Sequence, residues 1–365
     1  MNKKELFTDL KVVELAGVLA GPAVGMFFAE LGATVLKVEN PLNNGDITRS
    51  WRLESEQENT QSAYYSSVNY NKTILWADLK NADDFEIVMN QIATADVVIS
   101  NFKPSSAKKL GLDSVALRKK FPKLIYAQIS GYGIDDETPA FDVVLQAEAG
   151  FMYINGESGG TPLKMPIAMI DILAAHQLKE AILIALLQRS KTGIGAIAHI
   201  SLYNAALSSL ANQATNYLMG GEIPQRMGSI HPNIAPYGET FYTNDGKAIV
   251  LAVGNDKQFG MLCKCLNVVI DANSNLFKTN ALRVQNRIEL RKILATAISK
   301  VESLILLNEL KKNNVPCGEI RSLDEVLNNK TAQQMILSET LNDGQITKRM
   351  ATAVFDIYLY KVDTR

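Results

Sequence analysis

The sequence is poor in cysteine and histidine, with three of each in 365 residues, and its formal net charge is only −1. Nucleic-acid-binding domains normally carry a clear excess of positive charge, so this balance argues against such a partner. No apolar run approaches the roughly 20 residues needed to cross a membrane. The opening stretch, MNKKELFTDL, also lacks the apolar segment of a signal peptide. These absences predict a protein with neither a nucleic-acid nor a membrane partner.

The few cysteines also limit the possible chemistry. Cys263, Cys265 and Cys317 cannot all pair with one another, and each lies in apolar surroundings. A place in a protein core is therefore favoured over a disulfide framework, which fits a reducing compartment and predicts a cytoplasmic location. No metal site is expected, because one Cys-x-Cys motif and three scattered histidines provide no second pair of ligands.

Short apolar segments alternate with helical patterns through the first 200 residues. Strands are expected at residues 10–15, 34–39, 74–79, 96–100, 124–130 and 196–201. Helices are expected at residues 23–31, 82–93 and 115–120. This alternation is typical of an α/β fold with a Rossmann-like parallel sheet, in which ligands bind at the carboxyl ends of the strands.

The pattern of apolar and polar residues changes twice along the chain, which predicts two domains and a connection between them. From about residue 226 the pattern alternates as in an antiparallel hairpin, with Asn244-Asp-Gly246 as its turn. We expect a large α/β domain at 1–200, a linker with a helix at 204–218 within 201–225, a smaller α+β domain at 226–315, and a return to the large domain at 316–365.

One acid stands at the start of the longest helical pattern, which runs from Ile167 to Gly193. Asp171 has two possible roles there. As an N-cap, its carboxylate would accept backbone N–H bonds that the helix leaves open. As a nucleophile, it would be kept ionised by the helix dipole.

The turn after the first strand resembles a dinucleotide-binding turn only in part. Glu39 ends the second strand, as in a dinucleotide fold, but residues 16–22 contain G-x-x-x-G-P rather than G-x-G-x-x-G. An NAD-linked dehydrogenase therefore remains an alternative.

Several motifs, in this order along residues 10–330, resemble the family III CoA-transferases, the CaiB/BaiF group. They read LKVVELAGVLAGP, ATVLKVENP, GD-x-x-R, NYNK, NFKP, LIYAQISGYG, RSKTGIG, HPNIAPYG, AVGNDKQF and VPCG. The resemblance implies an enzyme of acyl-CoA metabolism, a transferase of sulfur-containing groups. It also implies a homodimer whose two chains interlock like linked rings.

Asp171 matches the family's catalytic aspartate, which favours the nucleophile over the cap. Attack on an acyl-CoA thioester would give a mixed anhydride and then an aspartyl-CoA thioester, from which a second carboxylic acid takes CoA. The tetrahedral oxyanions need N–H donors. The resemblance places some of these donors in a loop of the small domain, here Gly254 and Asn255.

The resemblance also implies which residues contact CoA. Lys103 and Lys109 match the family's basic positions, Asn101 shares the NFKP motif with Lys103, and Arg49 and Lys72 lie in further matching motifs. Coenzyme A and acyl-CoA would be substrates, and no permanently bound cofactor is expected.

Two departures bear on the substrate and the reaction. Leu19 stands where formyl-transferring members carry glutamine, which argues against formyl or oxalyl groups. Phe141 stands where the racemase branch carries a proton-transferring histidine, and phenylalanine cannot act as a base. The alternatives are an acyl-CoA racemase or epimerase of the same family, and a non-catalytic acyl-CoA-binding relative.

Overall fold

The computed structural model describes residues 3–268 and 276–358, and internal contacts divide the chain into two units. The large unit contains the described parts of Met1–Phe151, Lys164–Glu222 and Thr331–Arg365. The small unit contains the described parts of Met152–Leu163 and Ile223–Lys330.

A six-stranded sheet forms the centre of the large unit, and all of its neighbouring strands are parallel. Its strands are β1 (Lys11–Leu15), β2 (Thr34–Glu39), β3 (Thr73–Trp76), β4 (Val97–Ser100), β5 (Ile125–Ser130) and β6 (Ile197–Ser201). Their order is β3-β2-β1-β4-β5-β6. The predicted α/β class, parallel sheet and strand positions are confirmed, with ends that shift by a few residues.

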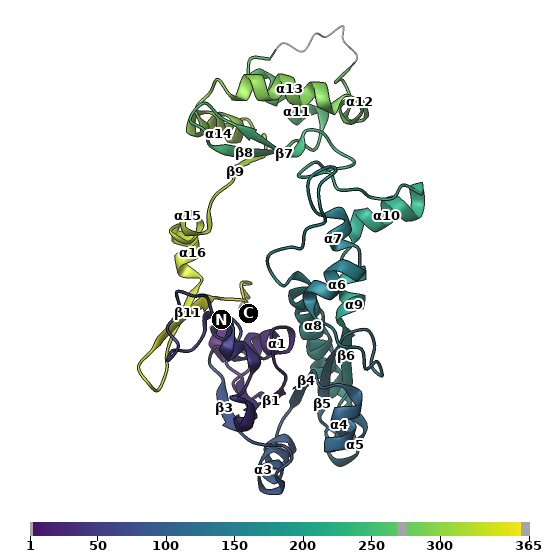
Figure 1. Ribbon diagram of the computed structural model, residues 1–365, viewed down its shortest axis with the longest axis vertical. Helices are drawn as coiled ribbons and strands as arrows, with labels where there is room; N and C mark the ends of the chain where they lie inside the picture. Colours follow the sequence, from purple (N-terminus) through teal and green to yellow (C-terminus); the bar gives the residue numbers. More distant parts are fainter. Residues whose placement is uncertain (1–2, 269–275, 359–365) are drawn as a thin grey trace, which may run out of the picture. The chain divides into compact units, whose positions relative to one another are not determined.

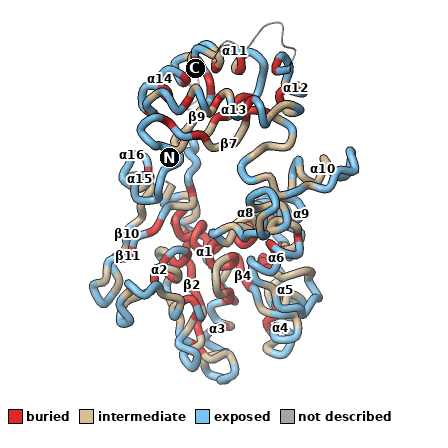
Figure 2. The backbone as a smooth tube through the Cα atoms, turned by 45° about the horizontal axis from the view of Figure 1, so that its top comes forward, coloured by how far each residue is buried: buried red, intermediate tan, exposed pale blue. Residues whose placement is uncertain are grey.

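Helices cover both faces of this sheet (Figure 1). One face packs against α1 (Ala20–Glu30) and α8 (Met169–Thr192), and the other against α3 (Ala82–Ala93), α4 (Pro104–Leu110) and α5 (Ser114–Lys120). Figure 2 shows the buried residues concentrated along the strands and α1. A strand covered on both faces is apolar along most of its length, which explains the apolar residues of β1 and β4, and the buried Glu14 is the exception in β1.

The remaining elements of the large unit are short. They are the 3-10 turns η1 (Lys3–Glu5), η2 (Pro41–Asn43) and η3 (Ile47–Ser50), and the helices α2 (Ala63–Ser66), α6 (Asp142–Glu148), α9 (Leu202–Ser208) and α10 (Ala211–Gly220). The helix α7 (Phe151–Ile154) belongs to the small unit apart from its first residue. The expectation of a single helix at 204–218 is wrong, because two helices, α9 and α10, occupy this region. The hydroxyls of Ser208 and Ser209 bond back to the Ala205 carbonyl, and the helix stops there.

The chain returns to the large unit late. After α16 (Lys330–Gln334), the strands β10 (Ile336–Thr340) and β11 (Ile346–Met350) form a hairpin. Beyond it, the backbone N–H groups of Thr352 and Ala353 donate to the buried Glu30 carboxylate of α1. The return starts near residue 331 rather than 316, because β9 (Cys317–Glu319) pairs with β8 in the small unit. The last part of the expected 316–365 segment, residues 359–365, lies outside the described residues.

The small unit is α+β. An antiparallel sheet of β7 (Tyr237–Tyr242), β8 (Ala248–Ala252) and β9 carries the expected hairpin, and the unit's helices are α11 (Asp256–Cys265), α12 (Asn280–Gln285), α13 (Arg287–Ile298), α14 (Ser303–Lys312) and α15 (Leu323–Leu327). All three cysteines are free thiols packed against this core, as predicted. Within residues 3–268 and 276–358, none of the helices has both the length and the apolar character of a membrane span.

Buried charges lie between the sheet and α1. The Glu14 carboxylate of β1 contacts the ammonium groups of Lys37, at 3.0 Å, and Lys72, at 2.8 Å. Lys37 also contacts Asp46 at 3.0 Å, and the side chains of all four residues are at most 1% exposed. Gly25 of α1 makes room for this cluster, because a Cβ there would overlap the Glu14 carboxylate. Buried charges persist only where opposite charges and hydrogen bonds compensate them.

Glu14→Gln is expected to lower the free energy of unfolding of the large unit by about 3–5 kcal/mol, because it leaves two buried ammonium groups with one carboxylate. Urea unfolding followed by tryptophan fluorescence isolates this unit, because both tryptophans, Trp51 and Trp76, belong to it. Glu58→Gln, at an exposed position, is the matched control and should change it by less than about 0.5 kcal/mol. Equal effects would contradict the stabilising role of the cluster.

Candidate active site

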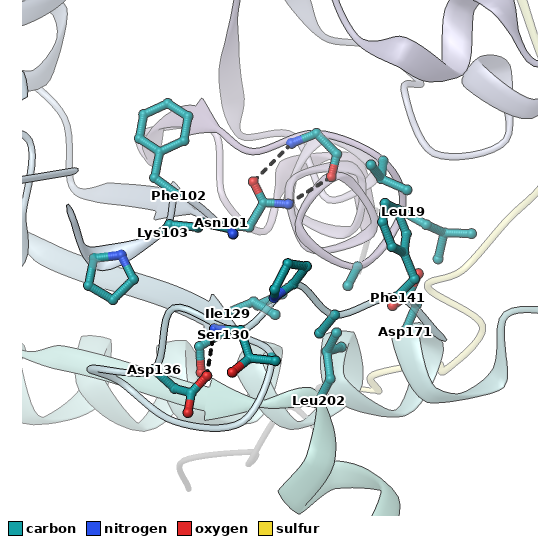
Figure 3. Close-up of a pocket in the computed structure, with 18 residues that line it drawn as sticks. Leu19, Asn101, Phe102, Lys103, Ile129, Ser130, Asp136, Phe141, Asp171 and Leu202 are labelled. Carbon is teal, nitrogen blue, oxygen red and sulfur yellow. Dashed lines mark hydrogen bonds between the residues drawn. The ribbon is translucent and has the colours of Figure 1, made fainter. Parts of the chain in front are cut away.

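A pocket opens at the carboxyl ends of β1, β4 and β5 (Figure 3). In the order β3-β2-β1-β4-β5-β6, the connections reverse direction between β1 and β4, which is where parallel sheets bind ligands. The lining residues follow these strands or begin helices, and are Gly17, Val18, Leu19, Ala20, Asn101, Phe102, Lys103, Pro104, Ile129, Ser130, Gly131, Asp136, Thr138, Pro139, Ala140, Phe141, Asp171 and Leu202. The volume of about 150 Å³ fits only the reacting end of a large ligand.

Asp171 is the buried acid of this pocket. It is the third residue of α8, only 7% exposed, and its carboxylate accepts no hydrogen bond from any described residue. In the first turn of α8, the Ile170 N–H donates a hydrogen bond to the Asp142 carboxylate at 2.7 Å, so Asp142 rather than Asp171 bonds a free N–H group of this helix end. The N-cap hypothesis for Asp171 is therefore wrong, and its carboxylate is free to meet a ligand.

The charge of Asp171 also differs from expectation. Burial, and then the nearby negative charge of Asp142, raise the pKa of Asp171 to about 7. The prediction that the helix terminus keeps this carboxyl fully ionised at neutral pH needs correction, because withdrawal from water opposes the helix dipole. A carboxyl with a pKa near 7 is about half ionised at neutral pH, and a pKa shifted in this way by burial is common at functional sites.

Two of the expected CoA-binding residues line the pocket. Asn101 forms a reciprocal pair with the backbone of Gly17: its amide donates to the Gly17 carbonyl at 2.9 Å and its oxygen accepts the Gly17 N–H at 3.2 Å. The dashed lines drawn from Asn101 in Figure 3 mark these two bonds. Lys103 precedes α4 and is exposed, with no ion pair to any described residue. Its ammonium group is therefore available to a phosphate or carboxylate.

The structure does not bring the other three basic residues to the pocket wall. Lys109 is exposed in the last turn of α4. Arg49 makes two hydrogen bonds to Glu39, at 2.6 and 3.0 Å, and lies over the Tyr65 ring. The Lys72 ammonium is buried against Glu14, and burial lowers its pKa to about 8. Arg49 and Lys72 therefore stabilise the fold around the site.

The expected oxyanion loop, Gly254 and Asn255, lies in the small unit, and both residues bond to Gln258 there. The Gly254 N–H donates to the Gln258 side chain at 2.9 Å. The Asn255 side chain accepts the Gln258 N–H at 2.9 Å and so caps α11. The Gly254 N–H becomes available for an oxyanion only if Gln258 moves.

Two charged residues that were not predicted from the sequence, Lys37 and Asp46, support the wall of this pocket. Asp46 accepts hydrogen bonds from the Val18 N–H, and Lys37 donates to the Ala16 carbonyl at 2.7 Å. The one available signal was a charged residue inside each of two apolar strands, Glu14 and Lys37. Tyr64 was also missed: burial, and then the negative charge of Asp171, raise the pKa of its hydroxyl.

Comparison with known proteins gives a consistent result. The family model described as CoA-transferase family III matches residues 7–361. A succinate–glutarate CoA-transferase from Agrobacterium fabrum is 39% identical over 362 residues, covering 97% of this chain and 90% of that protein. A succinyl-CoA:glutarate CoA-transferase from Mus musculus is 36% identical over 320 residues, covering 87% of this chain and 72% of its own length.

A solved structure agrees in fold as well as in sequence. The crystal structure of a CaiB/BaiF family protein from Brucella suis has a TM-score of 0.79 and 37% identity, covering 95% of this chain and 91% of that chain. The match of the family model over nearly the whole sequence, together with these relatives, means that this chain belongs to CoA-transferase family III.

Proposed function

We propose that this enzyme moves CoA from an acyl-CoA to a carboxylic acid, with Asp171 as the nucleophile. The observation that carries the proposal is a buried carboxylate without a hydrogen-bond partner among the described residues, in a pocket at the switch point of the sheet. Burial keeps the pKa of this carboxyl near neutrality, so the ionised form is present and poorly solvated.

The first half of the reaction loads CoA onto the enzyme. An Asp171 carboxylate oxygen attacks the thioester carbonyl, the C–S bond breaks, and CoA leaves as a thiolate from a mixed anhydride. The thiolate then attacks the Asp171 carboxyl carbon. The donor acid leaves as its carboxylate, and Asp171 becomes a thioester of CoA.

The second half reverses these steps with another acid. The acceptor carboxylate attacks the aspartyl thioester and expels the CoA thiolate, which then attacks the acceptor side of the new anhydride. The products are the new acyl-CoA and the regenerated Asp171 carboxylate. Each intermediate is prone to hydrolysis, so a pocket that excludes water favours transfer.

The pocket size and its charges suggest how acyl-CoA would lie. A volume of about 150 Å³ accepts the thioester and acyl group, while the pantetheine and nucleotide extend outward. Lys103 would then meet a phosphate at the pocket rim. Asn101 would act by holding the backbone of Gly17.

The substrates we propose are dicarboxylic. The Agrobacterium and mouse relatives are named for succinate and glutarate, both dicarboxylic acids, and both relatives exceed 35% identity with this chain. A dicarboxylic acyl group carries a second carboxylate, which needs a positive charge or N–H donors. Phe141 at the pocket wall provides neither a positive charge nor a side-chain N–H donor for that carboxylate. It also cannot act as the base that racemisation needs, so we favour CoA transfer over the racemase alternative.

We further propose that the working enzyme is an interlocked homodimer. None of the residues of α10 is buried, and Tyr217, Leu218 and Met219 near its end are 52%, 78% and 85% exposed. On α8, Ile184 and Leu187 are likewise exposed. Apolar surface of this kind normally packs against another chain.

Asp171→Asn is expected to fold and to lower CoA transfer by at least about 10³-fold, because the amide keeps the shape of the side chain but is not a nucleophile. The assay mixes enzyme with succinyl-CoA and glutarate and follows both CoA esters by mass spectrometry. Wild-type enzyme given succinyl-CoA alone should form a covalent adduct that hydroxylamine converts to a hydroxamate at Asp171. Transfer by Asp171→Asn near the wild-type rate, or exchange of α-deuterium without an adduct, would refute the mechanism.

The pH dependence of the first half-reaction should follow ionisation of Asp171. Since the carboxylate is the reactive form, kcat/KM should rise with pH to a plateau, with a midpoint near 7. Asp142→Asn removes the neighbouring negative charge but retains an oxygen for the Ile170 N–H, so the midpoint should move to lower pH. A midpoint that stays in place would show that Asp142 does not influence Asp171.

Lys103→Ala should weaken CoA binding by about 10-fold or more, because a charge-assisted phosphate contact contributes roughly 1.5–3 kcal/mol. Lys109→Ala should have a smaller effect, because Lys109 lies away from the pocket wall. Lys108→Ala, an exposed lysine of the same helix, is the control for the loss of a positive charge. Titration calorimetry at fixed salt concentration measures all three, and equal affinities would place CoA elsewhere.

A further inference from the structure

The segment that connects β1 to α1 contains a strained residue. Val18 has a φ of +72°, in the left-handed region that a β-branched side chain rarely adopts. It lines the pocket, and so do its neighbours Leu19 and Ala20, the residues that lead into α1. A conformation of this kind persists only where surrounding contacts impose it, and such residues are common at functional sites.

The contact that imposes this conformation is a buried carboxylate. The Val18 N–H donates to Asp46, at 3.1 Å from Oδ2 and 3.3 Å from Oδ1. On its other side Asp46 accepts from Thr48 and contacts the Lys37 ammonium at 3.0 Å. Besides Val18, two residues thus hold the Asp46 carboxylate in place through three contacts.

Other polar side chains hold the backbone on both sides of Val18. Lys37 donates to the Ala16 carbonyl at 2.7 Å, and Asn101 bonds both backbone groups of Gly17. Lys72 donates to the Pro22 carbonyl at 2.8 Å. We call Lys37, Asp46, Lys72 and Asn101 the backbone clamp. Lys37 lies in β2, Asp46 caps η3, Lys72 directly precedes β3 and Asn101 directly follows β4, so the clamp joins this segment to three strands of the sheet or their ends.

We propose that Asp46 is a positioning residue: by holding Val18 in its left-handed conformation, it keeps residues 18–20 as the pocket wall that sets the acyl-CoA thioester against Asp171. The inference rests on the proposed function. Without the Asp46 contact, Val18 would relax to negative φ and turn the following backbone. A displacement of about 1 Å in such a wall is enough to slow a reaction about 100-fold.

Asp46→Asn tests this directly, because an amide cannot replace the carboxylate here. Oδ2 faces the Lys37 ammonium and the Val18 N–H, and Oδ1 faces the Thr48 N–H and hydroxyl. Either orientation of asparagine sets its NH₂ group against a donor. We expect kcat for CoA transfer to fall about 100-fold, with KM for acyl-CoA changed by less than about 3-fold.

A second substitution separates positioning from general support of the fold. Glycine adopts a φ of +72° without strain, so in the Val18→Gly background the wall no longer depends on Asp46. The double variant Val18→Gly with Asp46→Asn should then have a kcat less than about 5-fold below that of Val18→Gly alone. Asn314→Gly, at φ +56° in the small unit, is the matched control and should leave the 100-fold loss unchanged. Equal losses in the Val18 and Val18→Gly backgrounds would overturn the proposal.

Amide hydrogen exchange supplies a readout that needs no activity. Exchange in residues 16–21 should rise in Asp46→Asn while exchange in β5 stays unchanged, and unchanged exchange in both segments would overturn the proposal. If Asp46→Asn prevents folding, Thr48→Val can replace it, because this change removes the hydroxyl bond to Asp46 and leaves the carboxylate charged. Thr48→Val should lower kcat less than Asp46→Asn does. In the Val18→Gly background this loss of kcat should disappear. Wild-type enzyme that transfers no CoA would refute the proposed function instead, while the exchange result would still decide whether Asp46 holds this segment.

Discussion

The large unit depends on a set of opposite charges enclosed between its sheet and α1. Glu14, Lys37, Lys72 and Asp46 neutralise one another where water is absent, so none can be removed alone without leaving an uncompensated charge. An apolar core would pack as well here, but it could not bind backbone N–H and C=O groups. The charges fix the connection between β1 and α1, and this connection is one wall of the pocket.

Much of the fold could be predicted from the sequence, because strands buried on both faces give continuous apolar runs. The helix at 82–93 was predicted to the residue, since Asn81 caps it and the apolar pattern ends with it. The break near Ser209 was not predictable, because it depends on hydroxyl groups competing with the helix backbone. The expected return to the large domain at residue 316 was also wrong, because β9 is a three-residue strand with too little sequence pattern to show that it pairs with β8.

The site was harder to predict than the fold. Resemblance to the family was enough to select Asp171, but the pKa of this carboxyl is raised by its burial and then by the charge of Asp142, which belongs to a different helix. Motif matching likewise grouped Lys103 with Lys72, although one is exposed at the pocket and the other is buried in the core. A motif records that a charge is needed at a position. Only the tertiary structure tells whether that charge meets a ligand or another side chain.

The bond between Glu30 and the backbone of Thr352 and Ala353 has a consequence for the order of events during synthesis. Glu30 leaves the ribosome early, yet its buried carboxylate has no backbone donors until more than three hundred further residues have been made. The small unit, through Lys330, is complete before these donors emerge. The large unit is therefore the first to begin emerging from the ribosome and the last to be completed. A chain still attached to the ribosome keeps an unpaired carboxylate at α1, and the packing around that helix closes only when synthesis is nearly over.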